Sequence, residues 1–184
     1  VFRPAGHLGG IEKGMDYHTD RGEGCDFYDM GKRRGCGGLS VWIDGVPHPA
    51  ETFDSYRIRR NQNDSIAFNL EYATWDVPGL VLKEKREIKM SLGTNLFKAT
   101  STLQSEKNQE LIIAIGLSTF GNPDVYQDQN LGILSIWEQI DPEHGSLGTA
   151  ILVNPEDIID FATYNDDEFL LINVKTNVPF VYHA

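Results

Sequence analysis

Hydrophobic and polar residues alternate along most of the chain from residue 38 onward. The clearest case is residues 65–75, where the large apolar positions are Ile66, Phe68, Leu70 and Tyr72. A period of two residues is typical of a strand that is buried on one face. The pattern therefore predicts strands over most of the sequence.

Nine stretches carry strand patterns, and turn signals such as Asp44-Gly45 or a proline separate them. They are residues 39–43, 56–60, 65–75, 80–91, 95–103, 111–119, 131–138, 147–153 and 169–175. In residues 80–91 the alternation is less clean because charged residues stand at most positions, which predicts an exposed strand with cross-strand charge pairs. The only helical pattern follows Asn154 and predicts a turn or two. We expect an all-β fold, an antiparallel β-sandwich with broad curved sheets.

The length of 184 residues suits one large sandwich domain over residues 1–184. Residues 180–184 are apolar and aromatic and resemble a strand still in progress, so we expect a piece of a longer polypeptide. No apolar run approaches the 18 residues or so that a membrane-spanning helix needs. Cys25 and Cys36 permit a disulfide in an oxidising compartment but do not require one.

The formal net charge of −11 is distributed unevenly. Residues 1–92 hold 13 of the 16 Lys and Arg residues against 14 acidic residues, and residues 93–184 hold 3 against 13. A net acidic chain argues against duplex DNA or RNA as a partner, because phosphate binding needs a surplus of cations. The acidic half is typical of a solvated surface. A local basic cluster at Arg21, Lys32, Arg33 and Arg34 can hold one carboxylate or sulfate.

Residues 16–38 differ from the rest of the chain, since six of these 23 residues are glycine and no strand or helix period is present. Such a segment is either an irregular surface connection or a loop in which polar side chains converge on a ligand. The glycines do not form a phosphate loop, and a serine nucleophile motif is absent.

Three chemistries fit the polar residues of this segment. Proton abstraction beside a carboxylate needs proton carriers, for which Tyr17 and His18 are suited, and an arginine clamp such as Arg33 or Arg34. A glycosidase would use two carboxylates, which Asp16, Glu23 and Asp26 can supply. A divalent metal held by His18 and carboxylates remains an alternative, although no fixed ligand spacing supports it. For Tyr17 and His18 an ordinary structural role is an equal alternative.

Other aromatic and histidine residues carry weaker signals. His183 ends a strand pattern and can return to the sheet face that carries the site. Trp42, Trp75 and Trp137 each lie in or at the end of a strand pattern, which predicts core packing, with sugar stacking as the alternative.

Residues 16–31, 34–38 and 41–45 together resemble a bacterial family known only as a domain of unknown function, whose members occur in polysaccharide utilisation loci. The family pattern is Y-H-x-D-x-G-E-G-x-D-x-Y-x-V-G, followed by R-G-C-G-G and an aromatic strand with D-G. The matching residues are Tyr17, His18, Asp20, Gly22, Glu23, Gly24, Asp26, Tyr28, Gly31, Arg34, Gly35, Cys36, Gly37 and Gly38. The chain departs from the pattern at Cys25 and Met30 and is shorter than the family's members.

The resemblance implies a galactose-mutarotase-like β-supersandwich in the periplasm or outside the cell, acting on uronate-containing glycans with lyase or dehydratase chemistry. We expect Tyr17 and His18 as proton carriers and Arg34 as the group that neutralises the substrate carboxylate. Glu23, Asp26, Tyr28, Arg33 and His183 are expected to bind the substrate. The expected partner is an acidic oligosaccharide or polysaccharide, and no organic cofactor is expected. A glycan-binding sandwich without turnover and a glycoside hydrolase are the alternatives.

Overall fold

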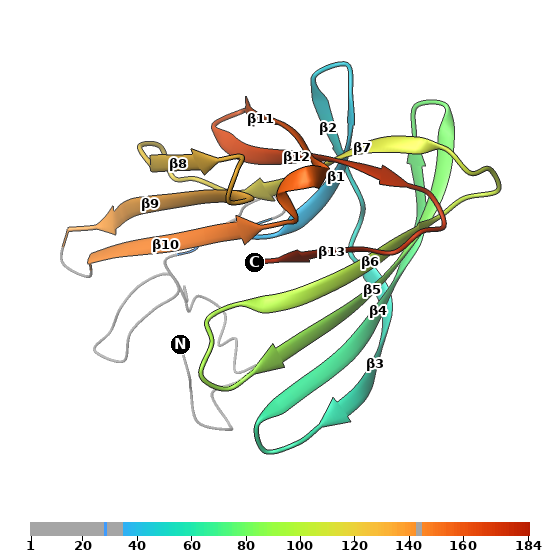
Figure 1. Cartoon of the computed structure of the whole chain (residues 1–184), viewed down its shortest axis with the longest axis horizontal. Coiled ribbons are helices and arrows are strands. Elements are labelled where there is room, and N and C mark those ends of the chain that lie inside the picture. The colour runs from blue at the N-terminus through green and yellow to red at the C-terminus, as the bar shows by residue number, and fades with distance from the viewer. Residues whose placement is uncertain (1–27, 29–34, 143–144) are drawn as a thin grey trace, which may run out of the picture.

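The structure is a computed structural model that describes residue 28, residues 35–142 and residues 145–184. Its strands form two antiparallel sheets (Figure 1). The smaller sheet has the order β11-β12-β7-β1-β2 and is built from β1 (Gly38–Ile43), β2 (Val46–Pro49), β7 (Glu110–Leu117), β11 (Ile158–Tyr164) and β12 (Asp167–Lys175). This architecture confirms the predicted all-β sandwich.

The larger sheet has eight strands in the order β3-β4-β5-β6-β13-β10-β9-β8. They are β3 (Phe53–Asn61), β4 (Ser65–Val77), β5 (Leu80–Ser91), β6 (Phe97–Gln104), β8 (Asp124–Asp128), β9 (Ile133–Asp141), β10 (Gly145–Leu152) and β13 (Phe180–His183). β13 joins the two halves of this sheet, and its pairing with β10 is limited to Leu152 and His183. The sheet therefore opens between β13 and the β9–β10 arm (Figure 1).

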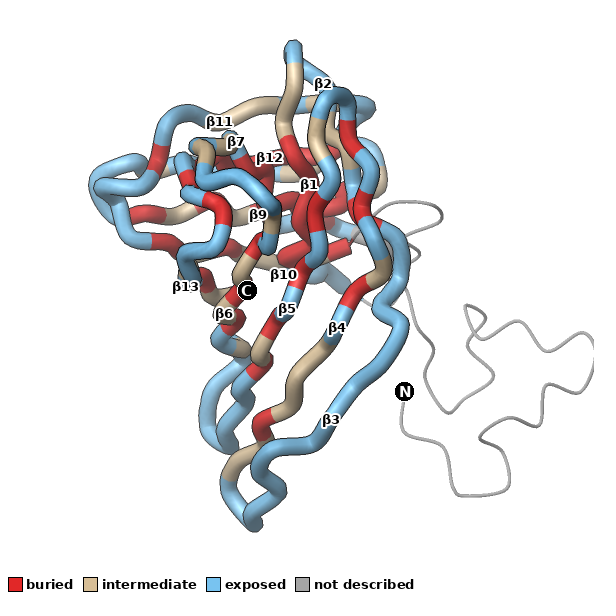
Figure 2. Tube along the Cα trace, turned by 90° about the vertical axis from the view of Figure 1, so that its right-hand side faces the viewer, coloured by how far each residue is buried: buried red, intermediate tan, exposed pale blue. Residues whose placement is uncertain are grey.

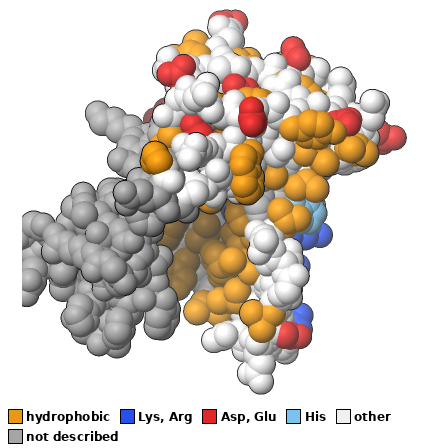
Figure 3. All heavy atoms as spheres, turned by 90° about the vertical axis from the view of Figure 1, so that its left-hand side faces the viewer, with side chains coloured by type: hydrophobic (Ala, Val, Ile, Leu, Met, Phe, Trp, Pro, Cys, Tyr) orange, Lys and Arg blue, Asp and Glu red, His pale blue; other side chains and the backbone are white. Residues whose placement is uncertain are grey.

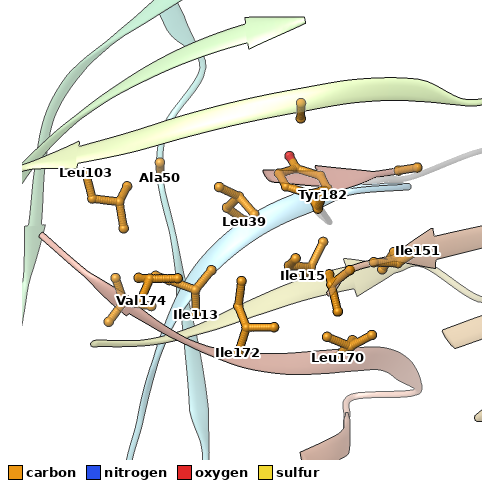
Figure 4. Close-up of a cluster of buried hydrophobic side chains, with 14 of the residues drawn as sticks. Leu39, Ala50, Leu103, Ile113, Ile115, Ile151, Leu170, Ile172, Val174 and Tyr182 are labelled. Atoms are coloured by element: carbon orange, nitrogen blue, oxygen red, sulfur yellow. The ribbon is translucent and has the colours of Figure 1, made fainter. Parts of the chain in front are cut away.

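The core lies between the facing sides of the two sheets (Figure 4). Its fully buried side chains come from both sheets and include Leu39, Ile113, Leu170, Leu103, Ile151 and Tyr182. The β3–β6 part of the larger sheet extends beyond the smaller sheet, and β3 is exposed along its whole length (Figure 2). The smaller sheet therefore does not cover this part of the larger sheet.

The prediction that β5 is an exposed strand is wrong for one of its faces. Its alternation is strict: Leu82, Glu84, Arg86 and Ile88 are buried, whereas the lysines between them are exposed. The two charged residues are tolerated inside because they pair with each other.

Three strands were not predicted, namely β2, β8 and β11. In β2, prolines at 47 and 49 are accommodated because β2 is an edge strand. The predicted short helix is confirmed as the 3-10 turn η1 (Pro155–Asp157), but the side chain of Asn154 makes no cap hydrogen bond. The chain returns to a strand at once, since Ile158 has extended backbone angles.

The three tryptophans have different environments. Trp75 is buried in the core as predicted, and Trp42 packs against Phe169 on the outer side of the smaller sheet. Trp137 is 58% exposed, so the prediction of core packing is wrong for this residue. Its cross-strand partner is Gly148, which has no side chain to cover the indole ring.

Candidate functional site

Most of the predicted site lies outside the described residues. This applies to Tyr17, His18, Glu23, Asp26, Arg33 and Arg34, while Tyr28 and His183 are described. In the described part of the chain, no three His, Cys, Asp or Glu side chains gather so that they can hold a metal ion. The same part contains no helix long and apolar enough to cross a membrane.

Tyr28 packs its ring edge against Phe120, with the ring centroids 5.4 Å apart. Burial raises the pKa of Tyr28 to about 12, with smaller increases from Cys36 and Asp167, and hydrogen bonding to Ser118 opposes the rise. The phenol therefore stays neutral at physiological pH and can act as a hydrogen-bond donor.

The loop under Tyr28 is held by a buried carboxylate that sequence reasoning did not identify. Glu138 is 4% exposed and accepts hydrogen bonds from the backbone N–H groups of Phe120, at 2.9 Å, and Asn122, at 3.0 Å. These bonds satisfy the charge of Glu138 and fix the backbone of the loop. Glu138 is thus a structural carboxylate.

Residues 35–38 form the described end of the glycine-rich segment, and contacts from both sheets hold them. The N–H of Gly35 donates to Ser118 Oγ at 3.2 Å, and the N–H of Gly37 donates to Gly116 O at 2.9 Å. From the larger sheet, the hydroxyl of Tyr182 donates to Gly37 O at 2.8 Å. Both sheets therefore position this motif.

Glycine is required at residue 37 for two reasons. Its φ of +76° lies in the left-handed region, and a Cβ there would stand 2.7 Å from the Cβ of Ala184. The R-G-C-G-G motif is thus shaped by close backbone approach at this point.

Cys36 turns its side chain toward the larger sheet, where the thiol donates to Ala150 O at 3.9 Å. The thiol is free, so the disulfide that the sequence permits is not formed. Burial raises the pKa of the Cys36 thiol, and the bond to Ala150 only partly offsets this. A protonated, half-buried thiol is not an activated nucleophile.

A groove with a volume of about 440 Å³ lies where the β9–β10 arm faces the start of β6. We call it the Trp137 groove; it is lined by Cys36, Asn95, Leu96, Phe97, Ser135, Ile136, Trp137, Gly148, Thr149, Ala150 and Ala184. A Cβ on Gly148 would stand 2.7 Å from the indole of Trp137, so the ring lies directly over the glycine. The hydroxyl of Thr149 is buried and has no hydrogen-bond partner among the residues that the structure describes.

The inner face of the larger sheet contains a second feature that sequence reasoning missed, the ion pair of Glu84 and Arg86. Arg86 Nε donates to Glu84 Oε1 at 2.7 Å, and the Ser101 hydroxyl donates to the same oxygen at 2.7 Å. The guanidinium lies 5.2 Å from the centroid of the Tyr72 ring. Leu82 and Ile88 stand on the same face of β5, and these apolar residues were the sequence signal that could have predicted the burial of Glu84 and Arg86.

Burial lowers the pKa of Arg86, but Tyr182 and Glu84 outweigh this effect and the net pKa is raised. Arg86 is therefore always charged and depends on its neighbours for compensation. Because Tyr182 also holds Gly37, the ion pair supports the surface on which the glycine-rich motif rests.

His183 lies on the opposite side of β13 from the buried Tyr182, since neighbouring residues of a strand point to opposite faces. It lines a separate groove of about 570 Å³, the His183 groove, together with residues such as Lys175, Asp157 and Asn173. The structure therefore does not bring His183 beside Gly37. Its role in substrate binding stays a prediction.

Comparison with known proteins finds one curated relative and one family model, and neither description names an activity. "Uncharacterized protein P7" of Formosa agariphila is 30% identical over 178 residues, which cover 91% of this chain and 43% of that protein. The chain thus spans less than half the length of this curated relative. No solved structure matches the chain. A family model described as "Domain of unknown function (DUF4861)" matches residues 7–184, and the chain belongs to this family.

Proposed function

We propose that the chain binds a uronate-containing oligosaccharide in the Trp137 groove and acts on it by β-elimination, as a lyase or dehydratase. The observation that carries the proposal is the exposed indole of Trp137, which lies over Gly148 in a groove that Cys36 also lines. Cys36 belongs to the R-G-C-G-G motif, so the groove adjoins the described end of the glycine-rich segment. We expect the protein to work in the periplasm or outside the cell.

The groove has the features of a sugar site. Its volume of about 440 Å³ falls within the range of about 300–1,000 Å³ that is typical of small-molecule sites. An exposed tryptophan offers a flat apolar surface for the C–H face of a pyranose ring. The unpartnered hydroxyl of Thr149 gains a hydrogen-bond partner if a sugar hydroxyl reaches it.

The proposed substrate is acidic because two arginines come shortly before the groove residue Cys36 in the sequence. Arg33 and Arg34 come directly before Gly35, and a guanidinium binds a carboxylate through two parallel hydrogen bonds. This contact also stabilises the negative charge that develops on the carboxylate when the neighbouring C5 proton is removed.

The proposed reaction needs one base and one acid. One of Tyr17 and His18 takes the proton from C5, the C5–H electron pair forms the C4=C5 double bond, and the C4–O bond breaks. The other residue gives a proton to the departing oxygen. Atoms and charge balance without an added oxidant or reductant.

The hydrolytic alternative would take its carboxylate pair from Asp16, Glu23 and Asp26, which lie outside the described residues. None of the described residues that line the Trp137 groove is Asp or Glu. Glu84 and Glu138 are already engaged with Arg86 and with backbone N–H groups. Binding without turnover is supported by the same tryptophan, and the experiment below separates it from elimination.

The test is incubation with uronate oligosaccharides while absorbance is followed near ~235 nm, where the unsaturated product of such a proton abstraction is expected to absorb. We expect an absorbance gain that His18→Ala and Tyr17→Phe reduce while substrate affinity remains. Absorbance that stays flat on several uronates, together with binding, would replace elimination by the binding-only alternative.

Sugar binding in the groove is tested with Trp137→Ala. Loss of a stacking contact of about 0.5–1.5 kcal/mol should weaken binding about 2- to 10-fold. Tyr126→Ala is the matched control, because Tyr126 is an exposed aromatic residue on β8 that does not line the groove. Equal affinity of the Trp137 variant and the wild type would show that the sugar does not bind there.

A further inference from the structure

The outer face of the larger sheet carries a row of basic side chains that runs across the strands. In the register of the sheet, Arg60 pairs with Ala67, Ala67 with Lys89, Lys89 with Lys98, and Lys98 with His183. Directly paired residues share a face, so the side chains of these five neighbours stand side by side. We call Arg60, Lys89, Lys98 and His183 the basic row.

The length of the basic row follows from sheet geometry. It crosses five neighbouring strands, β3, β4, β5, β6 and β13. Strands lie about 4.8 Å apart, so the row spans roughly 19 Å. It is therefore long enough to contact several units of an extended ligand.

The basic row is only partly neutralised within the described part of the chain. Lys89 contacts Glu87 at 2.7 Å, whereas Lys98 has no ion-pair partner among the described residues. Lys89 and Lys98 face each other directly, and such like-charge pairs destabilise a sheet. The direct pairing of Lys89 with Lys98 is an unfavourable arrangement that an anionic ligand would relieve.

The surroundings of the basic row are polar. Parallel to it runs a row with Arg57, Asn69, Glu87 and Thr100. Figure 3 shows mainly acidic side chains over the upper part of the molecule, whereas at the edge of the lower part Lys, Arg and His side chains appear together with acidic ones. The basic row also ends at the His183 groove, which Lys175 lines as well.

We propose that the outer face of the larger sheet binds an acidic polysaccharide along the basic row, with one end of the glycan at the His183 groove. Anionic groups of the glycan pair with the cations, and its hydroxyls bond to side chains such as Asn69 and Thr100. The proposal takes the chemical class of the ligand from the proposed function, but the surface is distinct from the Trp137 groove. It would hold a long chain while a shorter stretch enters that groove.

A polysaccharide fits this face better than a single-stranded nucleic acid. Proteins that bind single strands stack the bases on aromatic side chains. The two rows just described contain no Phe, Tyr or Trp between β3 and β13. Tyr72 and Tyr182 are buried on the inner face, and the exposed Phe53 and Tyr56 of β3 pair with Tyr72 and Leu70, which share that face.

The test uses Lys98→Glu and measures binding of polygalacturonate and dextran sulfate, which present the carboxylate and sulfate groups of acidic polysaccharides. Reversing the charge at the centre of the basic row should weaken binding of at least one of them about tenfold at low salt. The control is Lys107→Glu, which makes the same change at an exposed residue between β6 and β7 and should keep wild-type affinity. Because the new carboxylate faces Lys89, the variant should unfold at no lower temperature than the wild type.

Two further measurements separate this proposal from the proposed function. Lys98→Glu should leave the affinity for trigalacturonate unchanged, whereas Trp137→Ala should lower it. Equal weakening by Lys98→Glu and Lys107→Glu would overturn the proposal, because it would reveal a response to net charge alone. Binding of a single-stranded oligonucleotide or of anionic lipid vesicles as tight as that of both polysaccharides would also overturn it.

Discussion

The buried ion pair of Glu84 and Arg86 allows a quantitative test of how the larger sheet is stabilised. Glu84 is 1% exposed and Arg86 is 8% exposed, so neither charge is solvated by water. Glu84→Gln keeps the shape of the side chain and removes its charge, which leaves a buried guanidinium without compensation. Breaking a buried pair in this way typically costs about 3–5 kcal/mol.

The geometry around the pair places the estimate within this range. The contact is 2.7 Å long, and the same carboxylate oxygen also accepts from Ser101. Glu84 Oε2 and Arg86 Nη2 are buried without hydrogen-bond partners among the described residues, and without Glu84 only neutral groups, Ser101 and the ring of Tyr72, remain beside the guanidinium. We therefore expect the free energy of unfolding to fall by about 3–5 kcal/mol.

The assay is equilibrium unfolding in urea, followed by far-UV circular dichroism. The matched control is Glu71→Gln on the outer face of the same sheet, where Glu71 lies 3.6 Å from Lys85 and both side chains are more than half exposed. Such a surface pair contributes at most about 1 kcal/mol. If Glu84→Gln costs no more than Glu71→Gln, the argument from burial is wrong.

A double replacement checks the same reasoning. Substituting both members by apolar residues, Glu84→Leu with Arg86→Met, removes the need for compensation and should destabilise the fold less than Glu84→Gln alone. If the loss of unfolding free energy in the double variant equals the sum of the losses in the two single variants, this reasoning is wrong.

Three further outcomes are expected. Gly132→Ala should cost roughly 1–3 kcal/mol more in urea unfolding than Gly79→Ala, because both have a positive φ but only at Gly132 would a Cβ collide with backbone; equal costs would refute the steric argument. The pKa of Tyr28 rises from 10.0 to about 12 on folding, so its contribution to stability is complete below pH 10 and disappears as the pH approaches 12. Between these pH values the unfolding free energy of Tyr28→Phe should therefore fall less than that of the wild type. Identical pH profiles of the two proteins would contradict the pKa shift. In a Cys25→Ser background, Cys36 should react with a thiol reagent near pH 8 much more slowly in the native protein than in denaturant, since burial raises its pKa, and equal rates would speak against its burial.

The strand pattern was predictable from the sequence because alternation records which residues face the core. Residues 65–75 illustrate this, since their apolar positions face the inner side of β4. The same rule failed where tertiary contacts decide the environment. Charge at Glu84 and Arg86 suggested exposure, yet mutual pairing lets both be buried. Trp137 suggested a core residue, but its neighbour across the sheet is a glycine.

The candidate site was less accessible to sequence reasoning. The glycine-rich composition predicted a loop whose backbone approaches a ligand closely; the structure shows Gly37, with its positive φ, packed against the side chain of Ala184, and the approach to a ligand stays a prediction. Which elements surround the motif depends on residues far away in the chain, such as Ser118 and Tyr182, and no local pattern encodes them. The roles of Tyr17, His18 and Arg34 stay predictions, because these residues lie outside the described part of the chain.

The position of β13 has a consequence for synthesis on the ribosome. Neighbouring strands from β3 to β6 pair in sequence order and can form a meander as soon as they emerge. β13 inserts between β6 and β10, and Phe180 pairs with Ser101. Until residues 180–183 have been made, the hydrogen-bonding edge of β6 has no partner strand, and such an edge can pair with other chains. Pairing of β13 with β6 should therefore be the step that joins the two halves of the larger sheet, after the β3–β6 meander has formed.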